Sequence, residues 1–447
     1  MDRKIHDAIR ISLDGEPIEA QEGDTVAAAL LRAGITTFTR SIKYHRPRGP
    51  FCLSVTCGQC LIQVDGVPSL PACRVRAQEG MECVRQNAPL GFVEKDVFRA
   101  ADFLFPEGLD HHHLLTGSRV LGRVALEIAR RLAGLGELPE KMRAPAPGEA
   151  RKIQLAVVGA GPAGLSAARA AAATGARVLL IERALRPGGA ALLGIDPDGP
   201  DERWATREVR ALLDAGGELL VGASCVGLYP NDSQLEGNAL LAVLSGGRLI
   251  LVAAERVVVA NGGAPQPLPF PGVDRPGVYA ARGLLSLHQQ CGVRVGKKLA
   301  VVGDGKELVD CARALRRAGY ELARVVSVGS DRLAAADVEI QQAQPARALG
   351  NPVRAIDLRL DARVPSKLER VRCDAVAIAL SPAPLQALGA SAGATAKWVS
   401  SLHGFPLEID ADGRTSVPWL FAAGRVAGLG GARAVASGEA AGKAACR

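Results

Sequence analysis

Aromatic residues are scarce in this sequence, at 4% of its 447 residues. Proteins that bind single-stranded nucleic acid stack bases on aromatic side chains, so this scarcity argues against a nucleic-acid partner in spite of the formal net charge of +8. No apolar run approaches the ~18 uninterrupted residues of a membrane span, and the first residues do not resemble a signal peptide. We therefore expect a cytoplasmic protein without a transmembrane segment.

Cysteine is plentiful by contrast, with ten residues. Because cytosolic proteins rarely form disulfides, cysteines that cluster in such a sequence suggest metal ligands. Four of them have the spacing C-x4-C-x2-C-x12-C, namely Cys52, Cys57, Cys60 and Cys73. A C-x4-C-x2-C run with a more distant fourth cysteine is the ligand spacing of a 2Fe-2S cluster, so we predict that these four hold one.

Other cysteines do not share this spacing. Cys83 is a rival for the fourth ligand position, although it lies one segment further along the chain than Cys73. We expect the scattered remainder to be small core or surface residues: Cys225, Cys291, Cys311, Cys373 and Cys446.

The first 98 residues predict a small α+β domain around these cysteines. Residues 25–33 form a predicted helix with Asp24 as its N-cap, and Asp65-Gly66 is a typical hairpin turn. That hairpin would bring the chain back to Cys73. The order of loop, strand, turn and returning cysteine resembles the ferredoxin-like (β-grasp) domains of succinate dehydrogenases and molybdenum hydroxylases.

A glycine-rich motif follows the predicted strand Ile153–Val158 and leads into a predicted helix. It reads Gly159-Ala160-Gly161-Pro162-Ala163-Gly164, and a second predicted strand ends at Glu182, 18 residues after the last glycine. The glycines let a pyrophosphate approach the helix N-terminus, and the acid can accept hydrogen bonds from ribose hydroxyls. This strand, turn and helix context predicts a dinucleotide site.

Three later segments favour FAD as the nucleotide. They are Arg183–Gly189 with its Pro-Gly-Gly, residues 257–263, which resemble an ATG crossover, and residues 420–426, which resemble the C-terminal GD segment of flavoproteins. The nucleotide contacts that we predict outside the glycine motif and Glu182 are Arg183, Gly188, Gly189, Val226, Ala260, Asn261, Gly262, Gly424 and Arg425.

A second glycine motif is incomplete. Residues 298–305 again read as a strand with two glycines, but Leu308 replaces the third glycine or alanine. No clear ribose-binding acid follows the predicted strand Val325–Val328. We expect a Rossmann-like domain whose site is blocked or altered, with a working NAD(P)H site as the alternative.

The predicted fold is α/β with a small α+β domain. A ferredoxin-like 2Fe-2S domain precedes a flavoprotein of the two-dinucleotide-binding-domain (Rossmann-like) type. The expected boundaries are residues 1–98 for the cluster domain, 99–150 for a connector, 151–265 with 374–447 for the FAD domain, and 266–373 for an inserted second dinucleotide-binding domain. The run His111-His112-His113 lies in the connector and reads as a solvated or interface segment.

Four phrases together resemble one family over nearly the full length. They are residues 40–49, the cluster loop, residues 131–139 and residues 271–278. The sequence looks like the α subunit of heteromeric sarcosine oxidases, and equally like related hydrogen cyanide synthase, opine oxidase and hydroxyproline or proline dehydrogenase complexes, with the 2Fe-2S and FAD parts fused.

The resemblance implies a partner chain. In that family an amino-acid-oxidase-like β subunit oxidises the substrate, and its FAD accepts a hydride from an amine carbon. Electrons then pass towards the α-type subunit, often through an FMN at the interface. The resemblance thus implies a hetero-oligomer with a 2Fe-2S cluster, FAD, an interface FMN and an outside electron acceptor. It also implies that the basic segment Arg40–Arg48 binds a flavin phosphate or faces the partner.

The sequence departs from this family at two further places. Arg425 stands where these flavoproteins place an aspartate, which suits a more acidic or differently posed nucleotide. The sequence also ends at Arg447, without the cysteine-rich segment of many relatives, so we expect a single cluster.

The leading hypothesis is therefore an iron–sulfur flavoprotein subunit of an amine or amino-acid dehydrogenase or oxidase. No acid–base dyad, nucleophile motif or catalytic metal site emerges from the residues, so we predict no catalytic residue in this chain. The alternatives are a self-contained NAD(P)H:acceptor reductase and a scaffold that holds ADP, ATP or NAD without turnover.

Overall fold

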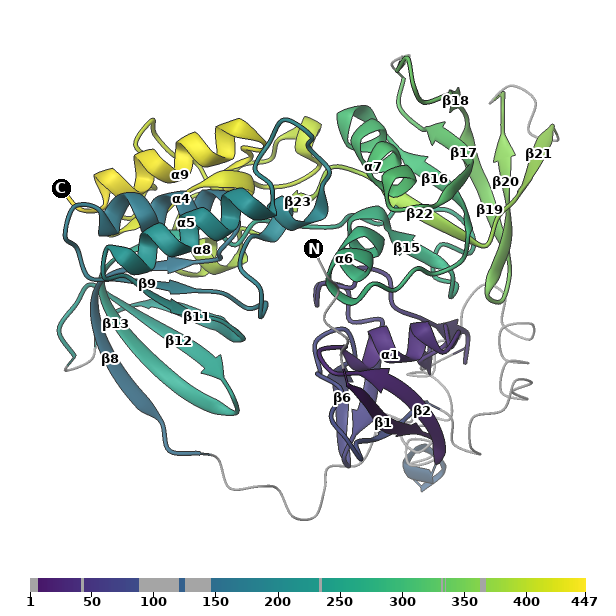
Figure 1. The fold of residues 1–447 in the computed structure, drawn as a ribbon, viewed down its shortest axis with the longest axis horizontal. Helices are drawn as coiled ribbons and strands as arrows, with labels where there is room; N and C mark the ends of the chain where they lie inside the picture. Colours follow the sequence, from purple (N-terminus) through teal and green to yellow (C-terminus); the bar gives the residue numbers. More distant parts are fainter. Residues whose placement is uncertain are drawn as a thin grey trace. The chain divides into compact units, whose positions relative to one another are not determined.

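The computed structural model describes residues 7–41, 44–87, 120–124, 146–232, 235–330, 333, 335–361 and 367–447. The chain divides into two compact units (Figure 1). The first unit contains residues 1–142 and 267–380, and the second contains residues 143–266 and 381–447. Most of the predicted connector, including the histidine run, lies outside the described residues. Within the described part of the chain, no helix has the length and apolar content needed to cross a membrane.

The N-terminal domain of the first unit is a five-stranded mixed sheet in the order β2-β1-β7-β5-β6, with α1 packed against it. An Asp65-Gly66 turn joins β5 to β6, as the sequence predicts, and both residues have positive φ. The elements are β1 (Ala8–Leu13), β2 (Glu16–Gln21), α1 (Val26–Arg32), β3 (Thr39–Arg40), β4 (Pro47–Arg48), β5 (Leu61–Val64), β6 (Val67–Pro71) and β7 (Glu82–Val84).

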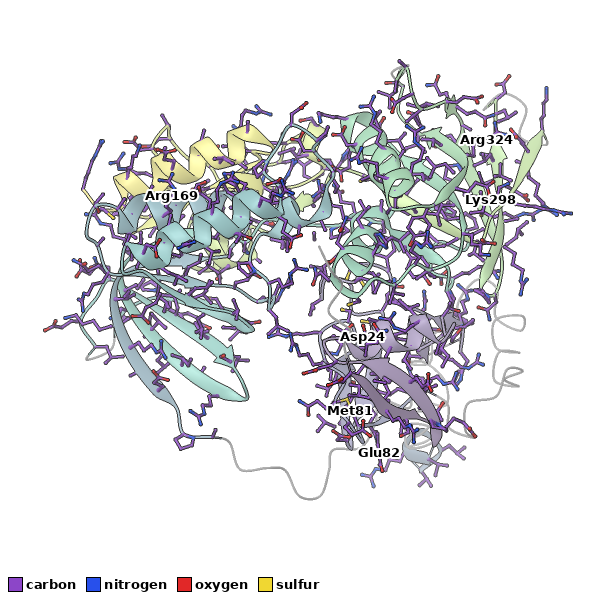
Figure 2. The ribbon with its side chains drawn as sticks, in the orientation of Figure 1. Asp24, Met81, Glu82, Arg169, Lys298 and Arg324 are labelled. Carbon is purple, nitrogen blue, oxygen red and sulfur yellow. The ribbon has the colours of Figure 1, made fainter. Side chains whose placement is uncertain are left out.

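The cap of α1 differs from the prediction. Thr25 is the N-cap, and its hydroxyl accepts the backbone N–H of Ala28 at 3.1 Å. Asp24 is buried instead, where its carboxylate lies 2.8 Å from the guanidinium of Arg32 in the last turn of the same helix (Figure 2). The prediction of Asp24 as the N-cap was therefore wrong by one residue, because an ion pair engages this carboxylate.

The inserted domain completes the first unit in three layers. Five parallel strands run in the order β15-β22-β16-β17-β18, α6 and α7 pack on one face, and the antiparallel strands β19, β20 and β21 cover the other. Arg324 of β17 pairs with Glu369 of β21 at 2.6 Å (Figure 2). The elements are β15 (Val278–Ala280), α6 (Ala281–Cys291), β16 (Lys298–Gly303), α7 (Gly305–Arg317), β17 (Glu321–Ser327), β18 (Ile340–Gln342), β19 (Gln344–Gly350), β20 (Val353–Arg359), β21 (Leu368–Arg372) and β22 (Ala375–Ala379).

The end of the inserted domain needs a correction. The sequence suggested a return to the FAD domain at residue 374, but β22 lies between β15 and β16 in the parallel sheet. All five residues of β22 are buried there. The chain therefore leaves the inserted domain after residue 380.

The second unit is built on a seven-stranded sheet. Five strands, β10-β9-β8-β13-β24, are parallel neighbours, while β11 and β12 form an antiparallel extension along the start of β13. The elements are β8 (Glu149–Val158), α4 (Pro162–Ala172), β9 (Val178–Ile181), η2 (Gly189–Leu193), α5 (Glu202–Asp214), β10 (Glu218–Leu220), β11 (Ala223–Pro230), β12 (Ala239–Ser245), β13 (Arg248–Val259), β14 (Gly263–Ala264), β23 (Ala383–Pro384), α8 (Ala387–Ser391), η3 (Ser400–Leu402), β24 (Leu420–Ala422), η4 (Gly424–Ala427) and α9 (Ala432–Ala444).

Close packing of α4 against α9 positions the start of α4 (Figure 1). A Cβ at Gly438 or Gly442 of α9 would lie about 2 Å from the backbone carbonyl oxygens of Ala163 and Ala167, so both positions require glycine. The helices can then approach backbone to backbone, with the alanines of α4 filling the core between them and the sheet. This arrangement fixes the glycine-rich turn between β8 and α4.

Candidate functional site

The N-terminal domain brings the four predicted cluster ligands together. The segment between β4 and β5 carries Cys52, Cys57 and Cys60, and the chain after β6 returns Cys73 to them. Cys52 lies close enough to Cys57 and Cys73, and Cys60 close enough to Cys73, for these thiols to shift one another's pKa. The sulfurs therefore form a series of neighbouring pairs, and a 2Fe-2S cluster takes two protein ligands on each iron.

These contacts also set the protonation of the four sulfurs. Hydrogen bonding to Cys57, and next to Cys73, holds the pKa of Cys52 well below its ordinary value, and hydrogen bonding to Cys73 lowers the pKa of Cys60. The same contact with Cys52 raises the pKa of both Cys57 and Cys73. Two of the four sulfurs thus have a lowered pKa and two a raised one. Since cluster iron binds thiolates, the group of four fits a 2Fe-2S cluster.

The backbone of the loop turns towards the first sulfur. The N–H groups of Ser54 and Thr56 donate to Sγ of Cys52 at 3.4 and 3.3 Å. Leu53 and Val55 adopt positive φ angles of 50° and 66°, a conformation that is strained for a β-branched residue such as Val55. The loop therefore accepts backbone strain to direct its amides onto a cysteine sulfur, and the sequence pattern gave no sign of these two amides.

Cys83 lies apart from the other four thiols. It belongs to β7, where it pairs with Leu13 and Val64, and burial raises its pKa to about 11. Among the residues that the structure describes, no three His, Cys, Asp or Glu side chains are placed to hold one metal ion.

The first glycine motif forms the turn between β8 and α4. A Cβ at Gly164 would lie 1.7 Å from the carbonyl oxygen of Gly159, so the helix can approach the strand only with glycine there. Gly161 is the N-cap of α4, with Pro162 in its first turn, no acidic residue in that turn and no side-chain cap. The N–H groups without a side-chain cap and the positive end of the helix dipole suit a phosphate.

Glu182 follows β9 directly and reaches back to this turn. Its carboxylate accepts the backbone N–H of Ala160 at 2.6 Å and that of Ala184 at 2.7 Å. A carboxylate has four acceptor positions, so it retains capacity for ribose hydroxyls. Glu182 therefore stands beside the glycine turn, as the motif predicts for a ribose-binding acid.

The Pro-Gly-Gly segment packs on the same turn. Gly188 donates its N–H to the carbonyl of Ala160 at 2.7 Å, and a Cβ at Gly189 would lie 2.9 Å from Cα of Gly161. Both glycines have positive φ. The segment thus borders the predicted phosphate position through backbone atoms alone.

Asn261 supplies an unsatisfied acceptor on the crossover segment. Its side-chain nitrogen donates to the carbonyl of Leu385 at 3.0 Å, whereas its buried Oδ1 has no partner among the described residues. A buried acceptor without a donor is destabilising, so it fits a ligand that donates a hydrogen bond. Ala260 is buried just before it, and a Cβ at Gly159 would lie 2.6 Å from the carbonyl oxygen of Ala260.

Arg425 lies in η4, against the crossover and the loop that leads into α9. A Cβ at Gly263 would be 2.7 Å from its Cγ, and a Cβ at Gly430 would be 2.6 Å from its Nη2. The first turn of α9 has no acidic residue and its N-cap, Gly431, makes no side-chain cap, although the carboxylate of Asp196 is close to the same loop. A guanidinium beside a helix N-terminus favours an anionic group such as a phosphate.

Two other predicted positions lie in less enclosed surroundings. Val226 is at a bulge of β11 and is 55% exposed, and Arg183 lies between β9 and η2. In the basic segment Arg40–Arg48, Arg40 is buried and donates to the carbonyl of His45, while Arg48 pairs with Asp274 at 2.6 Å. Internal contacts therefore engage both ends of this segment.

Comparison with known proteins follows the division into a cluster domain and a nucleotide-binding part. Residues 6–88 match the 2Fe-2S iron-sulfur cluster binding domain. Residues 153–444, more than half of the chain, match pyridine nucleotide-disulphide oxidoreductase. The chain belongs to the pyridine nucleotide-disulphide oxidoreductase family. It is an oxidoreductase, the predicted fold class is confirmed, and the two matches support a 2Fe-2S cluster and FAD as its cofactors.

Curated relatives agree with the resemblance read from the sequence. The chain is 28% identical over 437 residues to the sarcosine oxidase α chain of Rhizobium meliloti (strain 1021), a match that covers 91% of this chain but 43% of that protein. It is 26% identical over 316 residues to an opine oxidase subunit of Agrobacterium tumefaciens (strain Ach5), covering 63% of this chain and 62% of that one. The chain thus spans less than half the length of the sarcosine oxidase relative.

A solved structure shares the fold over most of the chain. L-proline dehydrogenase from P. horikoshii has a TM-score of 0.68 at 21% identity, and the match covers 95% of this chain and 70% of that one. Lactococcus lactis thioredoxin reductase matches 66% of this chain with a TM-score of 0.51 at 17% identity. At these identities the likeness concerns the fold.

Proposed function

We propose that this chain is the iron–sulfur flavoprotein subunit of a heteromeric FAD-dependent dehydrogenase or oxidase of amines or amino acids. The substrate class is that of sarcosine, proline, hydroxyproline or opines, whose CH–NH bond is oxidised in a partner β subunit. This chain relays the electrons through flavin and a 2Fe-2S cluster to an acceptor. An FMN at the interface with the partner belongs to the same proposal.

The grouping of Cys52, Cys57, Cys60 and Cys73 is the observation that carries the proposal. These four thiols stand on the same chain as a dinucleotide site with a glycine turn, Glu182 and an unsatisfied acceptor on Asn261. A flavin exchanges electrons singly or in pairs and a 2Fe-2S cluster exchanges one at a time, which is the chemistry that the two groups supply when bound.

The residues of the chain have holding and shielding roles in this proposal. The amides of Ser54 and Thr56 would stabilise charge on the sulfur of Cys52, and the first turn of α4 would hold the pyrophosphate of the nucleotide. The similarity to subunits of sarcosine and opine oxidases supports a separate substrate-oxidising chain.

Reconstitution with a partner tests the relay. The chain is purified alone and together with a β subunit of the sarcosine or opine oxidase type, and each preparation is mixed anaerobically with sarcosine, proline, hydroxyproline and an opine. We expect one substrate to bleach the cluster absorbance in the complex and none to do so in the chain alone. Rapid bleaching of the chain alone, or an iron-loaded complex that no substrate reduces, would contradict the proposed division of labour.

The identity of the bound nucleotide is a second test, because Arg425 stands where flavoproteins place an aspartate. Acid extracts of the purified chain and of Arg425→Asp are analysed for FAD, FMN, NAD and ATP. We expect FAD from both, because Arg425 suits an anionic group of the nucleotide and an acid at this place is the flavoprotein pattern that the resemblance implies. Release of ATP, ADP or NAD without any flavin would favour the scaffold alternative.

A further inference from the structure

Helix α6 of the inserted domain is hydrogen-bonded to the N-terminal domain at both ends. At its start, the N–H of the N-cap Ala280 donates to the carbonyl of Phe51, the residue before the first cluster cysteine, at 2.9 Å. At its end, Arg32 donates to the carbonyl of Cys291 at 2.8 Å, and the ion pair with Asp24 orients that guanidinium. The inserted domain thus contacts the N-terminal domain at both ends of α6, and the contact at the start of the helix is with the cluster loop.

The cluster loop packs directly on the first turn of α6. A Cβ at Gly283 would lie 2.7 Å from the carbonyl oxygen of Cys52 and 3.4 Å from Cβ of Leu53. Phe51 and Cys52 are buried in the hydrophobic core of the inserted domain, together with residues of its central sheet. Position 283 must therefore be glycine if the first cluster cysteine is to keep this place.

A third contact lies just before β15. Arg48 of β4 pairs with Asp274 at 2.6 Å, and a Cβ at Gly49 would lie 3.3 Å from Cβ of Pro276. The N-terminal domain is thus anchored on the segment before β15, on β15 itself and on α6. Because three consecutive segments of the inserted domain contact it, the N-terminal domain has one defined position on that domain.

The same first turn of α6 also reaches the second glycine motif. Arg282 binds the carboxylate of Glu307, in the first turn of α7, with two hydrogen bonds of 2.5 and 2.8 Å. Asp304 is the N-cap of α7, and its carboxylate accepts the N–H of Gly305 at 2.8 Å. An ion pair and a capping carboxylate therefore occupy the helix end that a pyrophosphate needs.

Comparison with α4 shows how the two motifs differ. The first turn of α4 contains no acid, whereas that of α7 contains Glu307 and follows Asp304. Leu308 is fully buried at the place that corresponds to Gly164. The register of β16 and β17 pairs Gly303 with Ser327, so a buried serine takes the position that Glu182 has in the first motif. In the second motif, other residues therefore take the positions that would bind a phosphate and a ribose in the first.

We propose that the inserted domain has exchanged its nucleotide site for a docking platform that positions the iron–sulfur loop, with Gly283 as the positioning residue and the Arg282–Glu307 pair closing the old site. This proposal rests on the proposed function, because it assumes that the loop holds a 2Fe-2S cluster. It makes α6 the element through which the N-terminal domain and the inserted domain act as one body. A platform of this kind keeps water away from Cys52, and solvent exposure is one determinant of a cluster potential.

Gly283→Ala tests the platform in the iron-loaded chain. The added methyl should displace the loop and let water approach Cys52, so we expect a less negative cluster midpoint potential and altered EPR g values. Gly438→Ala is the control, because it introduces a Cβ contact with a backbone carbonyl that is closer still, 2.0 Å, in a helix of the second unit, and it should leave both cluster signals unchanged. Unchanged cluster signals in Gly283→Ala, or equal shifts in both variants, would overturn the proposal.

Hydrogen exchange gives a readout that does not depend on a loaded cluster. In the apo chain, Gly283→Ala should speed amide exchange in residues 51–57 and 281–285 by roughly ten- to a hundredfold, as expected for an overpacked contact. Arg32→Gln, which removes the anchor at the other end of α6, should speed exchange in the last turn of α6. No change in either variant would exclude the docked arrangement.

Reduced nicotinamide nucleotides test the closed site. Anaerobic NADH or NADPH should leave the visible spectrum of the holo chain unchanged, and bleaching would overturn the loss of the nucleotide site. A chain that cannot be loaded with iron would defeat the proposed function, whereas the exchange experiment on the apo chain would still decide whether Gly283 holds the loop.

Discussion

Four thiols in one loop region are the most specific residues of this protein. Their sequence spacing predicted a cluster, and the fold places the sulfurs in neighbouring pairs while Cys83 lies in a strand of the sheet. The competition between Cys73 and Cys83 for the fourth position is therefore open to a direct test by substitution.

Cys60→Ser should abolish the cluster spectrum and leave the bound nucleotide in place, because the two sites belong to different units. Iron content, visible absorbance and extracted nucleotide measure this outcome. Cys83→Ala is the matched control and should keep its iron. Joint loss of iron and nucleotide in Cys60→Ser would contradict the separation of the sites, and loss of iron in Cys83→Ala would favour Cys83 as a ligand.

Two glycines of the first motif have different tasks. A Cβ at Gly164 would meet the backbone of Gly159, whereas a Cβ at Gly161 meets no protein atom within 4 Å. Gly164→Ala should therefore lower both the free energy of unfolding, by about 1–3 kcal/mol, and nucleotide content.

Gly161→Ala should fold normally yet bind nucleotide weakly, since its methyl would stand where the pyrophosphate approaches the helix. Thermal unfolding together with nucleotide analysis separates the two effects. Equal destabilisation of both variants would argue against a phosphate beside Gly161.

At the scale of elements, the antiparallel strands β19 to β21 carry a row of charges in the inserted domain. Asp357 of β20 is buried between Arg347 of β19 and Arg370 of β21, whose side chains are 51% and 58% exposed. Hydrogen bonding to Arg370, and next to Arg347, lowers the pKa of Asp357 below its ordinary value. The row therefore links three strands by charge across one face.

Because the pKa of Asp357 is lower in the folded state, the stability that this row contributes depends on pH. The stabilisation from Asp357 is present above its unfolded pKa of about 4 and is lost as the pH falls through the lower folded-state value. Asp357→Asn should reduce the free energy of unfolding at pH 7 by about 1–2 kcal/mol, a value kept small because both arginines are largely exposed.

Urea unfolding at pH 7 and pH 3 checks this expectation. The difference in stability between the parent and Asp357→Asn should be smaller at pH 3 than at pH 7. A difference that is equal at both values would show that the row contributes no pH-dependent stability.

At the scale of the whole molecule, the chain folds into two units, each built from two separate stretches of the sequence. The first unit joins the N-terminal domain to the inserted domain although residues 143–266 lie between them in sequence. The second unit is formed by residues 143–266 and 381–447, which lie on either side of the inserted domain in the sequence. The cluster loop nevertheless packs with the inserted domain, because Phe51 and Cys52 are buried in the core of that domain.

Removal of the cluster should therefore destabilise the first unit alone. A ligand that binds only the folded state stabilises it, so chelation should speed hydrogen exchange in the N-terminal and inserted domains while residues 149–266 and 383–444 are unaffected. Mass spectrometry before and after chelation measures this directly. Cys60→Ser should not respond to the chelator, and faster exchange throughout both units would contradict the two-unit description.

The sequence by itself determined the local chemistry of this protein. Cysteine spacing, the glycine motif ahead of α4 and the acid that follows β9 depend on residues close together along the chain, where steric and hydrogen-bonding rules act directly. Those patterns predicted the fold class and both cofactors. They failed at Asp24, because the carboxylate pairs with Arg32 eight residues further on and does not cap the helix. They also failed at residues 374–380, because sheet pairing and not composition assigns β22.

Only the tertiary structure decided where the cluster domain docks and what became of the second nucleotide motif. Gly283 looks like an ordinary helix residue until the carbonyl of Cys52 is placed against it, and Arg282 and Glu307 are 25 residues apart before α6 and α7 bring them together. Such contacts arise when distant segments pack, so their energies leave no periodic trace in the sequence. Leu308 and the lack of a clear ribose-binding acid after the predicted strand Val325–Val328 were the local signs that the motif at α7 had changed.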